Sequence, residues 1–244
     1  MDFELLHGAS SLKGMVSFVE EPGPDGDFVK YDQSVYKGGG WMSTLMEQFG
    51  NIDIYLFDQL LKGNIAPGMR ILDAGCGGGR NLVYLMREGY EVFAVDGSPD
   101  VVDWVRSMAE KLAPTLPAAN FRAEAIEATS FPDAFAQVVI CNSVLHFARD
   151  DGHFERMIQG LWRVLSPGGL LFCRLASTIG GNFEKIKDRQ FLMPDGSEWY
   201  LVDEALLLWL TSALGGELVD PLKTTVVQGT RCMTTWVVRK IPVN

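Results

Sequence analysis

Short apolar runs alternate with runs of helical spacing along most of the chain. The apolar runs are almost continuous, as in strands that are buried on both faces, and cover 69–73, 91–96, the region of 121, 137–142 and 170–175. Apolar residues at helical spacing, with capping and stop signals, predict helices over 52–61, 80–88, 98–112, 154–165 and 203–214. This alternation of strand and helix predicts a doubly wound, mainly parallel α/β sheet.

The last part of the chain departs from this alternation. Two β-rich runs, 217–227 and 232–239, flank a short turn sequence at 228–231. The turn leaves no room for a crossover helix, so the two runs must pair as an antiparallel hairpin.

The chain is expected to divide into an N-terminal cap or lid segment with helices, residues 1–65, and a main domain, residues 66–244. Within the main domain, residues 177–201 are too many for a simple connection and are rich in aromatic side chains. We expect this insert to roof a substrate pocket. An insert of this kind can instead bury its own residues or form a dimer surface, so a homodimer is compatible with the sequence.

Composition narrows the classes of function. With 47% apolar residues the chain can bury a full core, and four cysteines without Cys-x-x-Cys spacing predict reduced, buried thiols. A formal net charge of -10 argues against a nucleic-acid or anionic-membrane partner. Neither a signal peptide nor a long apolar span is visible, so we expect a soluble, cytoplasmic protein.

A glycine cluster, Gly75 to Gly79, follows the first buried strand and precedes a helix. Such a turn lets a ligand approach the backbone and is typical of nucleotide-like cofactors. Arg80 stands where the dinucleotide fingerprint requires Gly or Ala, which weakens a nicotinamide assignment. Asp96, at the end of the second strand, is placed to accept both hydroxyls of a ribose, which favours an adenosine derivative.

Four ordered motifs resemble those of class I S-adenosylmethionine-dependent methyltransferases. They are Asp73 to Gly79, Val95-Asp96, Phe121 to Ile126 and Arg163 to Gly169. The resemblance implies a Rossmann-like, seven-stranded sheet with one antiparallel strand, S-adenosylmethionine as cofactor and S-adenosylhomocysteine as product. The segments 79–81 and 144–147 are similar to small-molecule enzymes of the tellurite-resistance type.

The resemblance also assigns roles to residues of the cofactor site. Asp73 would receive the α-ammonium of the cofactor, and Glu124 would lie near the adenine amino group, although Glu127 remains an alternative. The complete set of expected cofactor-binding residues is Asp73, Gly75, Cys76, Gly77, Arg80, Asp96, Gly97, Ser98, Glu124, Ala125, Ile126, Cys141 and Asn142.

Methyl transfer from a sulfonium requires mainly alignment, so a catalytic base is optional. His146, just after the fourth strand, is the best candidate for a base, with an apparent pKa expected near 6–7; the alternative is a structural histidine. Tyr31, Tyr36 and Trp41, which interleave with glycines, are the candidates for a lid together with His146. We expect no metal, because no acidic run has suitable spacing.

The fourth strand is followed by Asn142-Ser143-Val144-Leu145, without the two prolines and aromatic ring of amino-methylating nucleic-acid enzymes. The sequence thus favours a methyltransferase with a small-molecule acceptor, whose methylated atom (O, N, S or a chalcogen) stays open. The alternatives are a nicotinamide-dependent oxidoreductase and a non-catalytic protein that binds S-adenosylmethionine.

Overall fold

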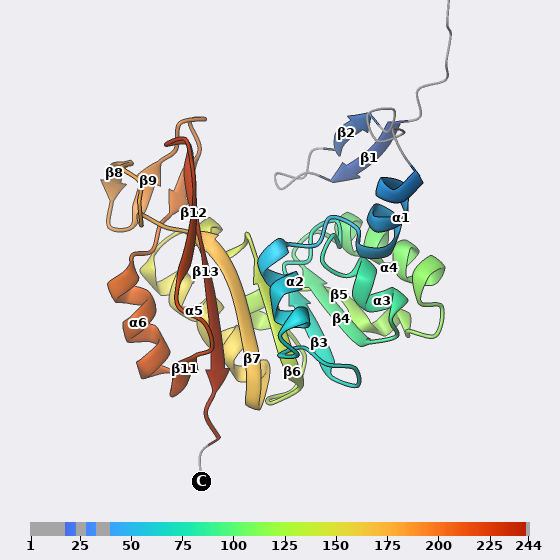
Figure 1. Ribbon diagram of the computed structural model, residues 1–244. Coiled ribbons are helices and arrows are strands. Elements are labelled where there is room, and N and C mark those ends of the chain that lie inside the picture. The colour runs from blue at the N-terminus through green and yellow to red at the C-terminus, as the bar shows by residue number, and fades with distance from the viewer. Residues whose placement is uncertain (1–17, 23–27, 33–39, 243–244) are drawn as a thin grey trace, which may run out of the picture.

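One large mixed sheet organises the protein (Figure 1). The computed structural model describes residues 18–22, 28–32 and 40–242, with side chains from residue 45 onward. The strand order is β11-β13-β7-β6-β3-β4-β5. Its parallel members are β3 (Arg70–Ala74), β4 (Glu91–Asp96), β5 (Phe121–Ala123), β6 (Ala136–Asn142) and β7 (Leu165–Ala176). The predicted mainly parallel sheet is confirmed, with seven strands along this order and an eighth, outside it, that pairs with β13.

The predicted C-terminal hairpin is also confirmed, with one difference. β12 (Lys223–Val227) and β13 (Arg231–Lys240) pair antiparallel, and β13 also pairs antiparallel with β7. The run predicted over 217–227 is divided, because β11 (Gly216–Leu218) pairs with the other end of β13. Pro221 lies in the gap and has no N–H to give to the ladder, so the edge breaks there.

Helices cover both faces of the sheet. The buried side chains of α2 (Ile54–Leu61), α3 (Val83–Arg87) and α4 (Pro99–Leu112) belong to one apolar core. Those of α5 (Asp151–Val164) and α6 (Glu204–Ala213) belong to the core on the opposite face. α1 (Gly40–Phe49) precedes them. This arrangement buries the central strands on both sides, as their apolar sequences predict.

The helix predicted over 80–88 begins three residues later than expected. The Leu82 N–H closes a tight turn on the Gly79 carbonyl, and the Asn81 side chain accepts a hydrogen bond from the distant Asp53 N–H. The residues after the glycine cluster thus form a turn that contacts α2 before α3 starts.

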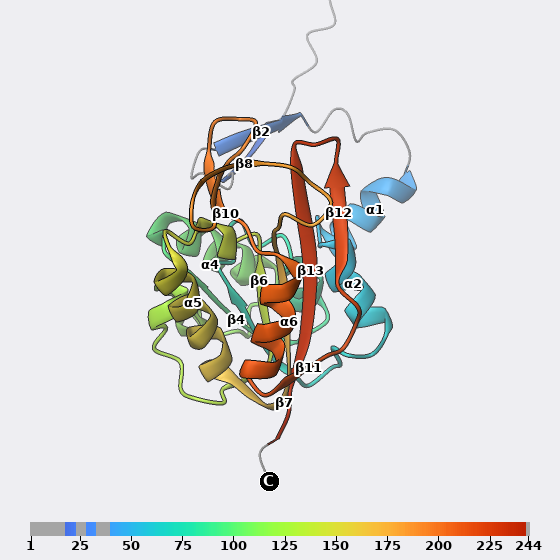
Figure 2. The same ribbon diagram turned by 90° about the vertical axis from the view of Figure 1, so that its left-hand side faces the viewer.

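Two small antiparallel units lie beyond the end of the sheet at which the parallel strands finish (Figures 1 and 2). One is the insert, which consists of β8 (Glu184–Lys187), β9 (Gln190–Leu192) and β10 (Glu198–Tyr200). The other is the hairpin of β1 (Phe18–Pro22) and β2 (Phe28–Asp32). Met193 and Leu201 of the insert segment pack on Ala176 and Met233 of the main sheet.

Leu56 of α2 is fully buried in the core of the main sheet, although it precedes the predicted boundary at residue 65. That boundary stays a prediction. All four cysteines are free and buried, as the sequence predicts. Among the described residues, no helix has the length and apolar character that crossing a membrane requires.

Gly160 of α5 packs closely against the 3₁₀ turn η3 (Ile126–Ala128). A Cβ at Gly160 would lie 2.5 Å from the Ile126 carbonyl oxygen and 2.9 Å from the Glu127 Cα. Both atoms belong to the backbone and cannot rotate away. We therefore expect Gly160→Ala to lower the free energy of unfolding by about 1–3 kcal/mol, measured by urea denaturation.

Gly152 in the same helix is the matched control. A Cβ there would have no neighbour closer than 3.4 Å. Because alanine is the better helix former, Gly152→Ala should leave stability unchanged or raise it by up to about 1 kcal/mol. Equal stability of the two alanine variants would contradict the packing argument.

Candidate active site

The carboxylate of Asp73, at the end of β3, is buried and has no hydrogen-bond partner. Its residue is 1% exposed, and neither carboxylate oxygen bonds to any group in the described part of the chain. Burial, which disfavours the charged form, raises the pKa of Asp73 to about 7, although Arg80 nearby opposes the shift. A buried acid without partners is costly, and a cationic ligand would remove that cost.

The glycine turn after Asp73 needs a left-handed backbone, with φ of +79° at Gly75 and +49° at Gly77. At Gly75 a Cβ would collide with the Val144 side chain, so packing against the loop after β6 requires this glycine. At Gly77 a Cβ would meet nothing within 4 Å, so this position faces open space. Cys76 between them is buried, and burial raises the pKa of its thiol well above the usual value.

Asp96, at the end of β4, fastens the turn. Its Oδ2 accepts the Gly77 N–H at 3.0 Å, and its Oδ1 accepts the Ser98 N–H at 3.0 Å. An ionised carboxylate can accept about four hydrogen bonds, so Asp96 keeps capacity for two ligand hydroxyls. Gly97 leaves the adjacent space open.

Both acids considered for the adenine contact have partners of their own. Glu124 accepts hydrogen bonds from the Thr129 hydroxyl and from both the N–H and the hydroxyl of Ser130. Glu127 contacts the His153 ring at 3.1 Å. The Ile126 side chain lies in the apolar core with α5, whereas Ala125 is exposed. In this loop, the backbone around the exposed Ala125 is therefore better placed than either acid to contact a ligand.

Asp53, which the sequence analysis did not single out, connects three parts of the site. It caps α2, and its Oδ2 accepts a hydrogen bond from Arg174 Nη1 at 2.6 Å. Arg80 Nη2 lies 3.7 Å from the same oxygen. Burial would raise the pKa of Asp53, but the charge and hydrogen bond of Arg174 outweigh burial and lower it. The position of Asp53 just before a helical run is the sequence signal for its role as a cap. No sequence signal indicates that Arg174 and Arg80 are its ionic partners.

His146 lies in the 3₁₀ turn η4 (Leu145–Phe147), under the insert. Its ring stacks on Trp199 of β10, with centroids 4.4 Å apart and an interplanar angle of 24°. The residue is 3% exposed, and its Nδ1 has no hydrogen-bond partner among the described residues. Burial, assisted by the charge of Arg231, lowers the pKa of His146 to about 4. This value lies below the range of 6–7 expected from the sequence, because burial disfavours the charged form of the ring.

Two further predicted residues lie on β6. Cys141 points into the core on the α5 face, where its register neighbour is Cys173 of β7. Asn142, the last residue of β6, lies on the opposite face, and its Oδ1 accepts a hydrogen bond from Ser143. Only Asn142 is thus placed at the polar edge.

The lid residues can be located only in part. Tyr31 belongs to β2 and Trp41 to α1, whose side chains at these positions lie outside the described residues. Tyr36 lies outside the described residues altogether. Their role as a lid stays a prediction.

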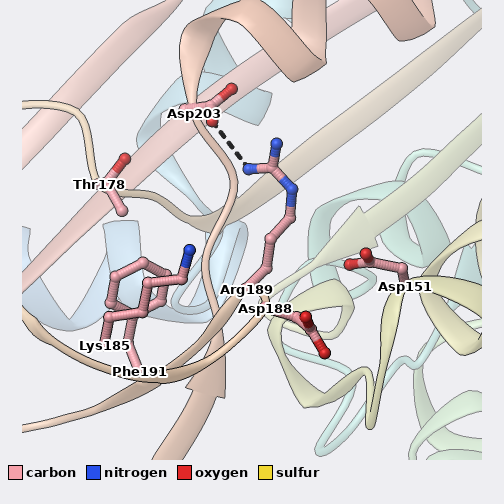
Figure 3. Close-up of a pocket in the computed structure, with 7 residues that line it drawn as sticks. All are labelled: Asp151, Thr178, Lys185, Asp188, Arg189, Phe191 and Asp203. Atoms are coloured by element: carbon pink, nitrogen blue, oxygen red, sulfur yellow. Dashed lines mark hydrogen bonds and ion pairs between the residues drawn. The ribbon is translucent and has the colours of Figure 1, made fainter.

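A separate polar hollow of about 290 Å³ opens between the insert and the starts of α5 and α6 (Figure 3). In its lining, Arg189 Nη1 lies 2.8 Å from Asp203 Oδ2. None of its lining residues is among the predicted site residues. In the part of the chain that the structure describes, no three His, Cys, Asp or Glu side chains gather as a metal site would require.

The geometry agrees with a comparison against known protein families. Residues 72–173, which run from β3 to β7, match the model of the family described as "Methyltransferase domain". Residues 72–173 are thus similar to a methyltransferase domain, and we call this segment the methyltransferase domain. The two acids and the glycine turn described above all lie within this methyltransferase domain.

Curated relatives of the methyltransferase domain differ in what they act on. The ubiquinone biosynthesis O-methyltransferase of Methylocella silvestris is 38% identical over 105 residues, 43% of this chain and 39% of its own length. The tRNA 5-carboxymethoxyuridine methyltransferase of Escherichia coli is 26% identical over 160 residues, which is 59% of each chain. The matches cover less than two thirds of these relatives.

A solved structure shows the same fold over more of the chain. The 1,6-didemethyltoxoflavin-N1-methyltransferase of Burkholderia thailandensis, crystallised with 1,6-didemethyltoxoflavin and S-adenosylhomocysteine, superposes with a TM-score of 0.61. It is 18% identical and the match covers 86% of this chain and 85% of that one. The methyltransferase fold thus extends beyond the matched 72–173 segment.

Asp73 should make the stability of the ligand-free methyltransferase domain fall with rising pH. Its folded pKa is about 7, above the ordinary 3.8, so the folded state binds more protons between these values. The loss begins near pH 4 and is complete above pH 7. Asp73→Asn removes this ionisable group. We therefore expect the free energy of unfolding of the variant to exceed that of the wild type by up to about 4 kcal/mol at pH 8.

The measurement is urea denaturation of both proteins at pH 4 and pH 8. At pH 4 the advantage of Asp73→Asn should nearly vanish, because the wild-type acid is then neutral when folded. An advantage that is independent of pH would show that Asp73 is not the buried, unpartnered acid described here.

Proposed function

We propose that this chain transfers a methyl group from S-adenosylmethionine to a small-molecule acceptor and leaves S-adenosylhomocysteine. The observation that carries the proposal is the buried carboxylate of Asp73 beside the glycine turn, for which the described residues supply no hydrogen-bond partner. The α-ammonium of this cofactor is a cation of suitable chemistry for such a group. The methyltransferase domain match supports the same reading.

The residues present fit the remaining parts of this cofactor. Asp96 has capacity for two hydroxyls and is fixed in place by two backbone N–H groups. Gly77 leaves space beside it. Because Glu124 and Glu127 are engaged elsewhere, we assign recognition of the adenine edge to the backbone around Ala125. Arg80 lies near enough to Asp73 for its charge to lower the pKa of that acid, and it suits the cofactor's carboxylate.

When bound, the cofactor supplies an activated methyl group, and the chain supplies alignment. The buried strands β3, β4 and β6 end together, so Asp73, Asp96 and Asn142 are positioned by rigid elements. The insert places Trp199 over His146 and excludes water from that side. Holding the two reactants in line can account for much of the rate of such a displacement.

A small-molecule acceptor agrees with the charge of the chain. The formal net charge of -10 disfavours a polyanionic substrate. Among the relatives, one is named for ubiquinone biosynthesis and another for a tRNA nucleotide, so the comparisons alone do not choose between these classes. Charge and the dry, aromatic surroundings of His146 favour the small molecule.

We assign His146 the role of the base. Its pKa of about 4 means that the ring is neutral at pH 7 and has a free lone pair, and also that burial and Arg231 make it a weak base. Its Nδ1 has no partner among the described residues, so it is not committed to a backbone group.

The first test is calorimetric titration with S-adenosylhomocysteine. We expect binding to the wild type, and a roughly 10- to 100-fold weaker binding to Asp73→Asn, because a charge-assisted contact is lost. Asp188→Asn, a change to an exposed acid on the insert, is the matched control and should bind as the wild type does.

NADH serves as the comparison ligand in the same experiment. Binding of NADH without binding of S-adenosylhomocysteine would contradict the proposed function. Equal affinity of Asp73→Asn and the wild type would contradict the assignment of Asp73 while leaving the function standing.

The second test uses His146→Phe, which keeps a ring against Trp199 but has no basic nitrogen. With an acceptor found from a panel of phenols, amines and thiols, turnover should fall by about 10²-fold or more. In the wild type the rate should fall as pH drops through about 4, and the variant should lack this limb. Full activity of His146→Phe would show that the histidine is structural.

A further inference from the structure

Three polar side chains form a row across adjacent strands at the end of the sheet. Asn142 of β6 is in register with Arg174 of β7, which is in register with Thr235 of β13. Residues in register point to the same face of a sheet, so these three side chains lie side by side. We call Asn142, Arg174 and Thr235 the donor row.

Each member of the donor row has a polar atom that nothing in the described chain satisfies. These atoms are Asn142 Nδ2, Arg174 Nε and Thr235 Oγ1. Asn142 and Thr235 are 8% and 4% exposed. Burial raises the pKa of Asp53, whereas Arg174 and, to a smaller extent, the nearby Asn142 amide lower it; Asn142 Nδ2 has no partner of good hydrogen-bond geometry in the described chain. Buried polar groups are normally paired, so such a set points to a ligand.

The unsatisfied atoms of the donor row share one chemistry, because each can donate a hydrogen bond. The charges nearby agree with it. Arg174 brings a positive charge to the row, and Asp53 Oδ2, 2.6 Å from Arg174 Nη1, pairs with only one of its nitrogens. The Arg174 side chain keeps 20% of its surface exposed although its Nε is buried, so a ligand has access to part of this side chain.

We propose that the donor row binds the carboxylate of an anionic methyl acceptor. The proposal rests on the proposed function, which it extends by naming a charge class of substrate. A carboxylate has two acceptor oxygens, and strands roughly 4.8 Å apart place a donor on each side of Arg174 within its reach. Tyr55, whose ring lies 5.2 Å from the Arg174 guanidinium, gives the acceptor an apolar neighbour.

The direction of the row favours the acceptor over the cofactor. The acids assigned to the cofactor stand on β3 and β4, whereas the row runs the opposite way, from β6 to β7 and β13. Thr235 is therefore three strands away from β3. Arg80, which follows the glycine turn, is the cation that remains for the cofactor's own carboxylate.

The experiment observes the Arg174 Nε–H directly by ¹⁵N-edited nuclear magnetic resonance. Its signal is assigned by its loss in Arg174→Lys. Benzoate is the probe, and benzamide, which has the same shape without the charge, is its control. We expect benzoate to shift the Arg174 signal and to bind about tenfold more tightly than benzamide, with and without S-adenosylhomocysteine.

Two valine variants test the hydroxyl of the row. Thr235→Val removes an unpartnered hydroxyl, so we expect weaker benzoate binding, by about five- to tenfold, without loss of thermal stability. Thr234→Val is the matched control. Its hydroxyl bonds to Ser177 and Thr224, so that variant should lose stability and keep its benzoate affinity.

The possible results separate the two proposals. If benzoate leaves the Arg174 signal unmoved, or binds no better than benzamide, the donor row is not a carboxylate site. If S-adenosylhomocysteine itself shifts that signal, and benzoate no longer does so in its presence, the row holds the cofactor and the inference is overturned. Failure of S-adenosylhomocysteine to bind the wild type by calorimetry would refute the proposed function instead.

Discussion

A single buried carboxylate, Asp53, holds together the parts on which the site depends. It caps α2, takes a hydrogen bond from Arg174 of β7, and lies within 3.7 Å of Arg80 from the segment after the glycine turn. Its backbone N–H bonds to Asn81 in the same segment. Removing one partner of such a buried ionic cluster costs far more than the pair contributes, so the cluster ties these three parts of the structure together.

The sequence predicted those features that local signals determine. Continuous apolar runs identified the central strands, and Asp203 before a leucine-rich run predicted the cap of α6, whose side chain accepts the Leu206 N–H. The glycines at 75 and 77 predicted a turn that only left-handed backbone can form. The sequence also predicted that Asp73 and Asp96, each at the end of a strand, lie at the same end of the sheet, because parallel strands end together.

The sequence could not predict which distant groups would meet. Asp53 and Arg174 are 121 positions apart, and Trp199 reaches His146 only because the insert folds back over η4. The dry environment that moves the pKa of His146 from 6–7 to about 4 has no local signature. The hydrogen bonds by which Glu124 closes its own loop through Ser130 had no signal in the sequence either, and its contact with adenine stays a prediction.

The position of β13 has a consequence for how the chain can assemble during synthesis. This strand follows β7, β11 and β12 in the chain, yet it lies between β7 on one side and β11 and β12 on the other. Until its residues leave the ribosome, β7 has an unpaired apolar edge. During synthesis from the N-terminus, the edge of β7 must therefore be protected until β13 is made and pairs with it.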